Sequence, residues 1–244
     1  MSNNYFQFKQ FTIHQDRCAM KVTTDACLFG GWGAEENKSE KVIPKTVLDI
    51  GTGTALLSLM YAQKNLFANI DAIEIDRDAS KQAKENASGS SFSERINIIH
   101  GDVKTFSFRK KYDCIISNPP FYEKEIRSDD ERTNMAHHGS GLLFEDLLNI
   151  IKQNLSTSGV FYLLLPFKRN DEIKKILFRQ NLFVSKLAFV KQSSQHGYFR
   201  LMIAGKSNLE GHAETFIEEI SIWNHQQQYT DGFKELLKDY YLHL

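Results

Sequence analysis

Mostly apolar stretches alternate with amphipathic ones along the chain from residue 46 onward. Short stretches that are apolar on both faces predict buried strands at residues 46–50, 70–75, 96–100, 113–117, 160–165, 183–190 and 200–204. Apolar residues at helical spacing predict helices at 55–65, 77–87, 142–155 and 170–181. Strands that alternate with helices favour a doubly wound α/β fold with a mostly parallel sheet between two helical layers.

The two ends of the chain depart from this alternation. Residues 6–9 and 11–14 alternate apolar and polar positions, which predicts a short hairpin, and residues 34–41 are polar and predict a linker. The last two strands are joined by a short polar stretch with no helix, so we expect them to pair antiparallel. We therefore divide the chain into an N-terminal extension, residues 1–45, and one α/β domain, residues 46–244.

Composition narrows the class of protein. The 244 residues are 41% hydrophobic and 25% charged, which excludes wholesale disorder, a coiled coil and a fibre. Cys18, Cys27 and Cys114 are widely spaced, so they predict neither a disulfide framework nor a zinc site and fit a reducing compartment. The first ten residues hold no apolar signal core, and the longest apolar run, residues 159–167, is too short to span a bilayer. We expect a cytoplasmic protein without a metal or a membrane partner.

A Gly-x-Gly turn follows the first strand of the domain, with Gly51, Thr52 and Gly53. Glycines allow unusual backbone angles and a close approach of the main chain to a ligand. Dinucleotide sites place a third small residue where this chain has Leu56, and Asp49 would be a poor neighbour for pyrophosphate. The turn therefore favours a nucleoside ligand that lacks phosphates and carries an ammonium or sulfonium charge. The alternative interpretation is a tight turn without a ligand.

Two further acids follow later strands. Glu74 ends the second strand of the domain, where a carboxylate can accept both hydroxyls of a ribose, and Asp102 follows the next strand, where it can accept an adenine amino group. Each acid alone could be a solvated loop residue. Together with Asp49 they fall at the carboxyl ends of successive strands, where ligands bind in open α/β sheets.

These residues carry a resemblance to a known family. Residues 49–59, Asp-Ile-Gly-Thr-Gly-Thr-Ala-Leu-Leu-Ser-Leu, resemble the cofactor loop of the S-adenosylmethionine-dependent class I methyltransferases. The resemblance implies a Rossmann-like, doubly wound, seven-stranded and mostly parallel sheet with an antiparallel C-terminal hairpin strand. It also implies S-adenosylmethionine as the cofactor.

Asn118, Pro119, Pro120 and Phe121 directly follow the strand at 113–117. The prolines lock the turn and leave the Asn118 amide oxygen and the Pro119 carbonyl as acceptors. Two acceptors on one exocyclic amine favour a pyramidal nitrogen whose lone pair faces a methyl group. Positioning of the amine then supplies most of the rate, and no strong general base is required. Phe121 would stack on the planar substrate. The alternative is a proline-terminated strand beside a core aromatic residue.

The Asn-Pro-Pro-Phe motif resembles that of the amino-methyltransferases, which methylate exocyclic nitrogens of bases or the amide of glutamine. Residues 11–32 and 218–244 further resemble a bacterial tRNA adenine-N(6) methyltransferase family, which modifies the adenine 3′ of the anticodon of a valine tRNA. This resemblance implies that Met20, Lys21 and residues 23–25 form a lid over the cofactor cleft; the alternative is a turn that caps a strand. It departs at residues 122–138, which are acidic and contain His137 and His138 where a more basic pattern is expected, so a phosphate contact by arginine there is in doubt. Neighbouring histidines rarely share a face, which disfavours a metal site.

The motifs and the resemblance together imply three sets of residues. The catalytic set is Asn118, Pro119, Pro120 and Phe121. The cofactor-binding set is Lys21, Asp49, Gly51, Thr52, Gly53, Glu74, Ile75, Asp102, Val103 and Asn118. The substrate-binding set is Phe121, Tyr122, Lys191, Tyr198 and Arg200.

Charge is unevenly distributed although Lys+Arg and Asp+Glu both number 30. Residues 166–206 hold nine basic and two acidic residues, a net charge of +7, whereas residues 207–244 have a net charge of −5. Residues 191–200 combine cations with Tyr198 and Phe199, which favours contact with a single-stranded RNA loop. The resemblance implies that this RNA is a tRNA, and we expect the enzyme to be a monomer.

Other functions use the same motifs. Guanine-amino methylation of rRNA, adenine methylation of DNA and glutamine methylation of a protein share the chemistry, and a non-catalytic RNA-binding module shares the fold. DNA enzymes of this kind commonly carry a separate recognition domain, and glutamine methyltransferases usually carry an N-terminal helical domain. Only about 45 residues precede the fold here, which favours tRNA, and the intact Gly51, Gly53, Glu74, Asp102 and Asn118 favour an enzyme.

Overall fold

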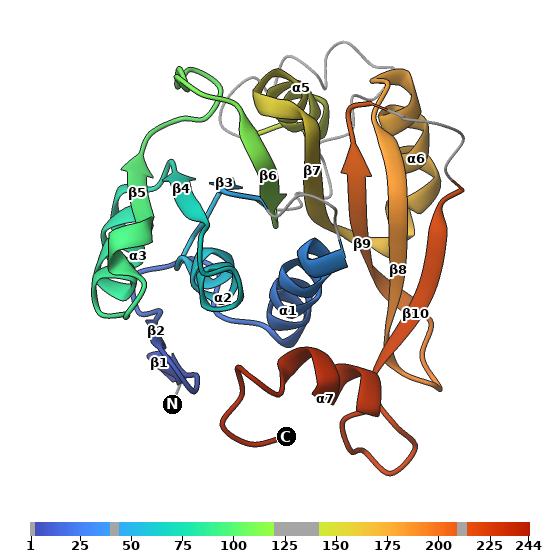
Figure 1. The fold of residues 1–244 in the computed structure, drawn as a ribbon. Coiled ribbons are helices and arrows are strands. Elements are labelled where there is room, and N and C mark those ends of the chain that lie inside the picture. Colours follow the sequence, from blue (N-terminus) through green and yellow to red (C-terminus); the bar gives the residue numbers. More distant parts are fainter. Residues whose placement is uncertain (1–2, 40–43, 120–141, 209–213) are drawn as a thin grey trace, which may run out of the picture.

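The computed structural model describes residues 3–39, 44–119, 142–208 and 214–244 (Figure 1). The elements, in chain order, are β1 (Tyr5–Gln7), β2 (Thr12–His14), α1 (Thr24–Ser39), β3 (Thr46–Ile50), α2 (Leu56–Lys64), β4 (Asn69–Glu74), α3 (Arg77–Ser88), η1 (Ser93–Arg95), β5 (Ile96–His100), β6 (Tyr112–Ser117), α5 (Phe144–Asn154), β7 (Leu155–Pro166), η2 (Phe167–Arg169), α6 (Asn170–Arg179), β8 (Phe183–Ser193), β9 (Tyr198–Lys206), β10 (Phe216–Trp223) and α7 (Asp231–Leu237). All seven strands and all four helices predicted within the domain are present.

The central sheet has the strand order β10-β8-β9-β7-β6-β3-β4-β5. Strands β3 to β7 are parallel, and β9 runs antiparallel to both β7 and β8. The mostly parallel sheet and the antiparallel β8–β9 pair are therefore confirmed. The described sheet has eight strands rather than seven, because β10 adds a parallel edge strand beside β8.

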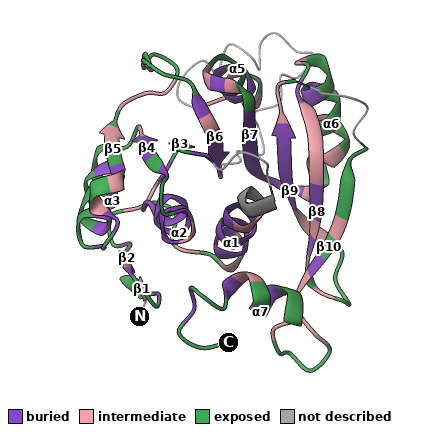
Figure 2. Ribbon diagram, in the orientation of Figure 1, coloured by how far each residue is buried: buried purple, intermediate pink, exposed green. Residues whose placement is uncertain are grey.

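Helices cover both faces of the sheet, as the doubly wound prediction requires (Figure 1). Helices α1, α2, α3 and α7 share one hydrophobic core, to which β3 contributes Val47. Helices α5 and α6 share a second core on the opposite face, to which β3 contributes Leu48. Most residues of the central strands β3 and β6 are buried, as is β7 from Gly159 to Pro166 (Figure 2). Among the described residues, no helix is both long and apolar enough to cross a membrane.

Helix α1 replaces much of the predicted linker, so the linker prediction was wrong for residues 34–39. Its three glycines disfavour a helix on intrinsic propensity. Packing explains the outcome, because a Cβ on Gly30 would lie 2.5 Å from the Met60 sulfur and one on Gly31 would lie 2.6 Å from the Leu236 carbonyl oxygen. The glycines let α1 approach α2 and α7 closely, and the buried Trp32 fills the core beside them.

The N-terminal hairpin of β1 and β2 forms as predicted and is attached to α3. The Asn86 side chain accepts a hydrogen bond from the His14 N–H and donates to the carbonyls of His14 and Thr54. Gln82 similarly accepts from the Arg17 N–H. Because Thr54 belongs to the turn that follows β3, one buried amide connects the extension, α3 and that turn.

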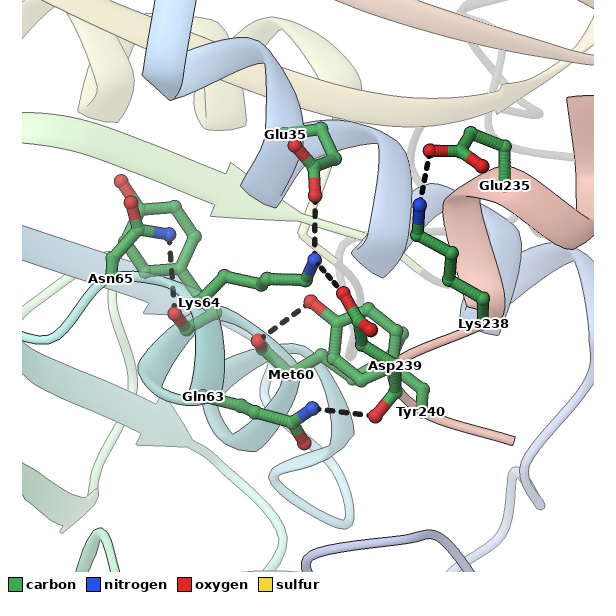
Figure 3. Close-up of polar contacts among 10 residues, drawn as sticks. Glu35, Met60, Gln63, Lys64, Asn65, Glu235, Lys238, Asp239 and Tyr240 are labelled. Atoms are coloured by element: carbon green, nitrogen blue, oxygen red, sulfur yellow. Dashed lines mark hydrogen bonds and ion pairs between the residues drawn. The ribbon is translucent and has the colours of Figure 1, made fainter. Parts of the chain in front are cut away.

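Lys64 connects the C-terminal end of the chain to α1 and α2 (Figure 3). Its ammonium lies 2.6 Å from a Glu35 carboxylate oxygen and also pairs with Asp239. The Tyr240 hydroxyl donates to the Met60 carbonyl at 3.0 Å. The Lys64 side chain is only 11% exposed, yet the two carboxylates outweigh the desolvation of its ammonium and raise its pKa.

Replacement of Lys64 should therefore destabilise the protein. We expect Lys64→Met to lower the free energy of unfolding by about 1.5–3 kcal/mol, because the largely buried ammonium of Lys64 donates charged hydrogen bonds to both Glu35 and Asp239. Urea unfolding measures the change. The matched control is Lys81→Met, since Lys81 pairs with Asp78 at an exposed helix surface and should leave the free energy of unfolding unchanged. Equal effects of the two substitutions would contradict a structural role for Lys64.

Candidate active site

The sheet reverses its strand order at β3. This strand pairs in parallel with β4 on one side and with β6 on the other, so Ile50 lies level with both Ile73 and Ser117. The Ser117 hydroxyl donates to the Ile50 carbonyl at 2.8 Å and fixes the end of β6 against β3. In open α/β sheets the crevice at such a reversal, outside the carboxyl ends of the strands, is the usual ligand site.

The Gly-x-Gly turn lies at this reversal. Gly51 and Gly53 have φ angles of +71° and +57°, which residues with a Cβ rarely adopt. The N–H groups of Gly51 and Thr52 both donate to the Ile73 carbonyl, at 2.9 and 3.1 Å, and hold the turn against β4. Among the described residues other than the adjacent residues in the chain, no heavy atom comes within 4 Å of a Cβ built on either glycine. The turn therefore presents open main chain, which suits a closely bound ligand.

Asp49 is buried beneath the turn, with an exposed fraction of 1%. One carboxylate oxygen, Oδ2, accepts hydrogen bonds from the hydroxyls of Thr52 and Ser58, each at 2.7 Å. The other, Oδ1, has no hydrogen-bond partner among the described residues. Burial raises the pKa of Asp49 to about 6, against the two hydroxyl hydrogen bonds. A buried carboxylate with a spare oxygen fits a cationic ligand group.

Thr52 and Ser58 thus act on the site through Asp49. The sequence placed Thr52 in the cofactor-binding set, whereas the structure shows its hydroxyl on the carboxylate. Ser58 was missed by the sequence analysis. It lies in the first turn of α2 and is buried. The sequence feature that could have identified it is a single hydroxyl residue in an otherwise apolar stretch of the predicted helix.

Glu74 ends β4 beside the same turn. Its Oε2 accepts the Gly53 N–H at 2.9 Å, and its Oε1 accepts the Asp76 N–H at 3.0 Å. The next residue, Ile75, is 60% exposed although it is apolar. The structure therefore brings the predicted acid and the predicted glycine turn into direct contact, with an apolar side chain open to a ligand beside them.

Asp102 lies at the same edge of the sheet, two residues beyond β5. Strand β5 pairs with β4 so that His100 is level with Glu74. The Asp102 carboxylate accepts the Lys104 N–H at 2.9 Å, and Val103 packs against the second core. Both residues are half-buried. The predicted convergence of Asp49, Glu74 and Asp102 at one sheet edge is thus present in the topology.

Asn118 and Pro119 directly follow β6, on the other side of the reversal. Asn118 is half-buried and Pro119 is buried. The remaining residues predicted to contact the substrate on this loop, Pro120, Phe121 and Tyr122, lie outside the described residues, as do His137 and His138.

The predicted lid residues precede or begin α1. Met20 is 52% exposed and Lys21 is also exposed. Asp25 on α1 pairs with the Arg200 guanidinium on β9 at 2.6 Å. Although burial disfavours the carboxylate, hydrogen bonds from Thr23 and Arg200 lower the pKa of Asp25. Arg200, predicted to bind substrate, is therefore held by α1 in this structure.

Lys191 and Tyr198, which were also predicted to bind substrate, are paired within the protein as well. The Lys191 ammonium lies 2.9 Å from a Glu219 carboxylate oxygen and 4.4 Å from the centre of the Tyr198 ring. The Tyr198 hydroxyl donates to the same carboxylate, which lowers the pKa of Glu219. Lys186, which precedes Lys191 on β8, pairs with Glu218 of β10 at 3.1 Å. Acids of β10 thus neutralise bases of β8, so the basic block of the sequence is not a uniformly basic surface.

Comparisons with known proteins agree with this geometry. Residues 36–162 match the family described as "Methyltransferase small domain". A protein from Dyadobacter fermentans, named "tRNA1(Val) (adenine(37)-N6)-methyltransferase", is 38% identical over 244 residues that cover 98% of both chains. A protein of the same name from Christiangramia forsetii is 38% identical, with complete coverage of both chains.

Solved structures show the same fold. A predicted O-methyltransferase from Agrobacterium tumefaciens superposes with a TM-score of 0.67 at 14% identity, covering 88% of this chain and 96% of the other. A glycopeptide N-methyltransferase complexed with S-adenosylmethionine gives a TM-score of 0.54 at 11% identity, covering 73% and 94%. With its fold, its glycine turn and its full-length relatives, the chain belongs to the methyltransferase small-domain family of S-adenosylmethionine-dependent enzymes.

Proposed function

We propose that the protein transfers a methyl group from S-adenosylmethionine to the N6 amine of an adenine in tRNA, the adenine 3′ of the anticodon of valine tRNA. The observation that carries this proposal is the likeness along the whole chain to proteins named for that reaction. The position of Asn118 and Pro119 beside the glycine turn supports it chemically. The enzyme would act as a monomer on tRNA in the cytoplasm, without a metal ion.

The residues at the sheet reversal fit the cofactor. The Glu74 carboxylate can accept the ribose hydroxyls, and the spare oxygen of Asp49 can accept the ammonium group of the methionine part. The open main chain at Gly51 and Gly53 leaves room for the cofactor to lie close. Ile75, Asp102 and Val103 would contact the adenine ring, with Lys21 at the lid. When bound, S-adenosylmethionine supplies an electrophilic methyl group.

Asn118 and Pro119 would hold the acceptor amine. The Asn118 amide oxygen and the Pro119 carbonyl can each accept one N6 hydrogen, which turns the nitrogen lone pair away from the ring and toward the cofactor. Fixing the amine in this way lowers the barrier through placement, and the methylated nitrogen then releases its extra proton to water. Phe121 would stack on the adenine, and Tyr122 would contact the substrate.

Nucleoside mass spectrometry tests the proposed function directly. Incubation of unmodified valine tRNA with the protein and S-adenosylmethionine should produce N6-methyladenosine, and replacement of the adenine 3′ of the anticodon should abolish it. Methylation of guanine, of DNA or of a protein glutamine instead would replace the proposed substrate. Absence of methyl transfer to any of them by folded, cofactor-binding protein would contradict an enzymatic role.

The Asn118→Ala substitution separates catalysis from cofactor binding. We expect kcat to fall by about 10²- to 10³-fold, as is typical for removal of one preorganised hydrogen-bonding group, with a nearly unchanged Kd for S-adenosylmethionine. Calorimetry and steady-state kinetics give the two values. The comparison variant, Glu74→Gln, should show the reverse pattern, with a weakened cofactor Kd as the main defect. A loss of cofactor affinity in Asn118→Ala would remove the residue from the acceptor site.

The raised pKa of Asp49 predicts two pH dependences. Without cofactor, folding favours the protonated acid, so its contribution to stability is complete below about pH 4 and is lost as the pH rises through about 6. The cofactor ammonium requires the ionised form, so cofactor affinity should fall by up to about tenfold per pH unit below 6. Calorimetry between pH 5 and 8 measures this slope. Asp49→Asn should bind weakly at every pH and lose the slope, and a slope that persists in the variant would assign it to another group.

A further inference from the structure

A hollow of about 350 Å³ lies between the turn that joins β8 to β9 and the segment that follows β10. None of the site residues discussed above lines it. The side chains that matter for its chemistry are Gln192, Gln195, His196, Trp223, His225 and Gln227. Strand β8 is antiparallel to β9, which is antiparallel to β7, so the carboxyl end of β8 lies at the same edge of the sheet as those of β6 and β7.

An aromatic stack supports one wall of the hollow. Trp223 stacks on Tyr229 with ring centres 4.1 Å apart and planes 19° apart, and Tyr229 stacks on Phe233 at 4.3 Å and 14°. Phe233 is fully buried in the core, whereas Trp223 is half-buried and reaches the hollow. The indole is therefore held rigidly at the outer end of a stack anchored in the core. Such a ring is a ready platform for a planar ligand.

The polar side chains that line the hollow are amides, a hydroxyl and imidazoles. Gln192, Gln195 and Gln227 are exposed, and each carries both donors and acceptors. None of the residues that line the hollow is Asp, Glu, Lys or Arg. This composition disfavours phosphate as the main ligand and favours a planar, uncharged group with donor and acceptor edges, which describes a nucleobase.

Hydrogen bonds hold the lining in place. His196 Nδ1 lies 2.7 Å from the Ser193 hydroxyl, within the β8–β9 turn. The Asn224 side-chain oxygen accepts the N–H groups of Gln226 and Gln228, at 2.9 and 3.0 Å, and closes the turn after β10. The two turns are also joined, because Ser193 and Trp223 are partners in the β8–β10 ladder. The hollow is thus formed before a ligand arrives, which lowers the entropic cost of binding.

The hollow lies within reach of the RNA that occupies the acceptor site. Three strand spacings separate β6 from β8, or about 14 Å at about 4.8 Å each. Ser117 is level with Leu187 on β8, and Ser193 at the hollow lies about 20 Å further along that strand at about 3.3 Å per residue. The two displacements combine to about 24 Å, which roughly seven stacked nucleotides cover at about 3.4 Å each. An RNA with its target adenine at Asn118 can therefore place in the hollow a base that lies several nucleotides from that adenine.

From the polar lining without acids, lysines or arginines and the anchored indole at the carboxyl edge of the sheet, we infer that the hollow binds an unpaired nucleobase of the substrate RNA several nucleotides from the methylated adenine. The base stacks on Trp223, and the side-chain amides of Gln195 and Gln227 bond its edges. This inference rests on the proposed function, since it assigns a second base-binding site for the same substrate. It makes the β8–β9 and β10 turns, rather than a basic surface, a determinant of which RNA is methylated.

Kinetics of exposed-residue variants test the inference. Gln195→Ala and Gln227→Ala should each raise the KM for tRNA by about 3- to 10-fold, the range of one net hydrogen bond, while leaving the cofactor Kd unchanged. The matched control is Gln153→Ala, an exposed glutamine near the end of α5 at the opposite edge of the sheet, which should leave KM unchanged. If the wild-type protein methylates tRNA and both variants of the hollow keep its KM, the inference about the hollow is contradicted and the proposed function is not. Wild-type protein that methylates no RNA would overturn the proposed function instead.

Tryptophan fluorescence gives a readout that does not depend on activity. The chain has two tryptophans, Trp223 and the buried Trp32, so a base that stacks in the hollow should quench the Trp223 emission. We expect an anticodon stem-loop RNA to quench the wild-type protein and to lose this effect with Trp223→Phe, which keeps a ring on Tyr229. Quenching that persists in Trp223→Phe would contradict the inference. Single abasic substitutions in the loop identify the bound nucleotide, since the one that removes quenching should also remove the effect of Gln195→Ala on KM.

Discussion

The parallel hydrogen bonding of β3 to strands on both sides is the constraint on which the rest of the structure depends. Because β4 and β6 both lie level with β3, the residues that follow all three strands emerge at one place. The glycine turn, Glu74 and Asn118 come together for this reason, although they are up to 67 residues apart in the chain, the separation of Ile50 and Ser117. Buried hydrogen bonds then fix the turn, because the hydroxyls of Thr52 and Ser58 both donate to the Asp49 carboxylate.

Elements outside the βα alternation support this reversal. Helix α1 shares a core with α2, the helix that begins just after the turn, and Asn86 bonds both the N-terminal hairpin and Thr54. Lys64 at the end of α2 then connects α1 to the C-terminal end of the chain. The turn is therefore positioned by contacts with both ends of the chain as well as by the sheet.

The edge of the sheet formed by β8, β9 and β10 has a different character. Here the acids of β10 lie beside the bases of β8, so the charges that stand in separate blocks of the sequence neutralise each other in pairs. The carboxyl edge of these strands carries a hollow of amides, imidazoles and an indole, with no Asp, Glu, Lys or Arg in its lining. Such groups can contact the edges and faces of bases and so distinguish one RNA from another, whereas a basic surface would bind any phosphate backbone.

The sequence by itself determined the alternation of strands and helices, the glycine turn and the acids at the strand ends, because each follows from local patterns of apolar residues and from motifs contiguous in the chain. Only the tertiary structure decided that Gly30 and Gly31 lie in a helix, since close packing against Met60 and Leu236 outweighs their low helix propensity. It likewise decided that Lys191 and Arg200 are paired within the protein, because their partners are 28 and 175 residues away. Local patterns carry no information on such distant partners, which depend on where β10 and α1 pack.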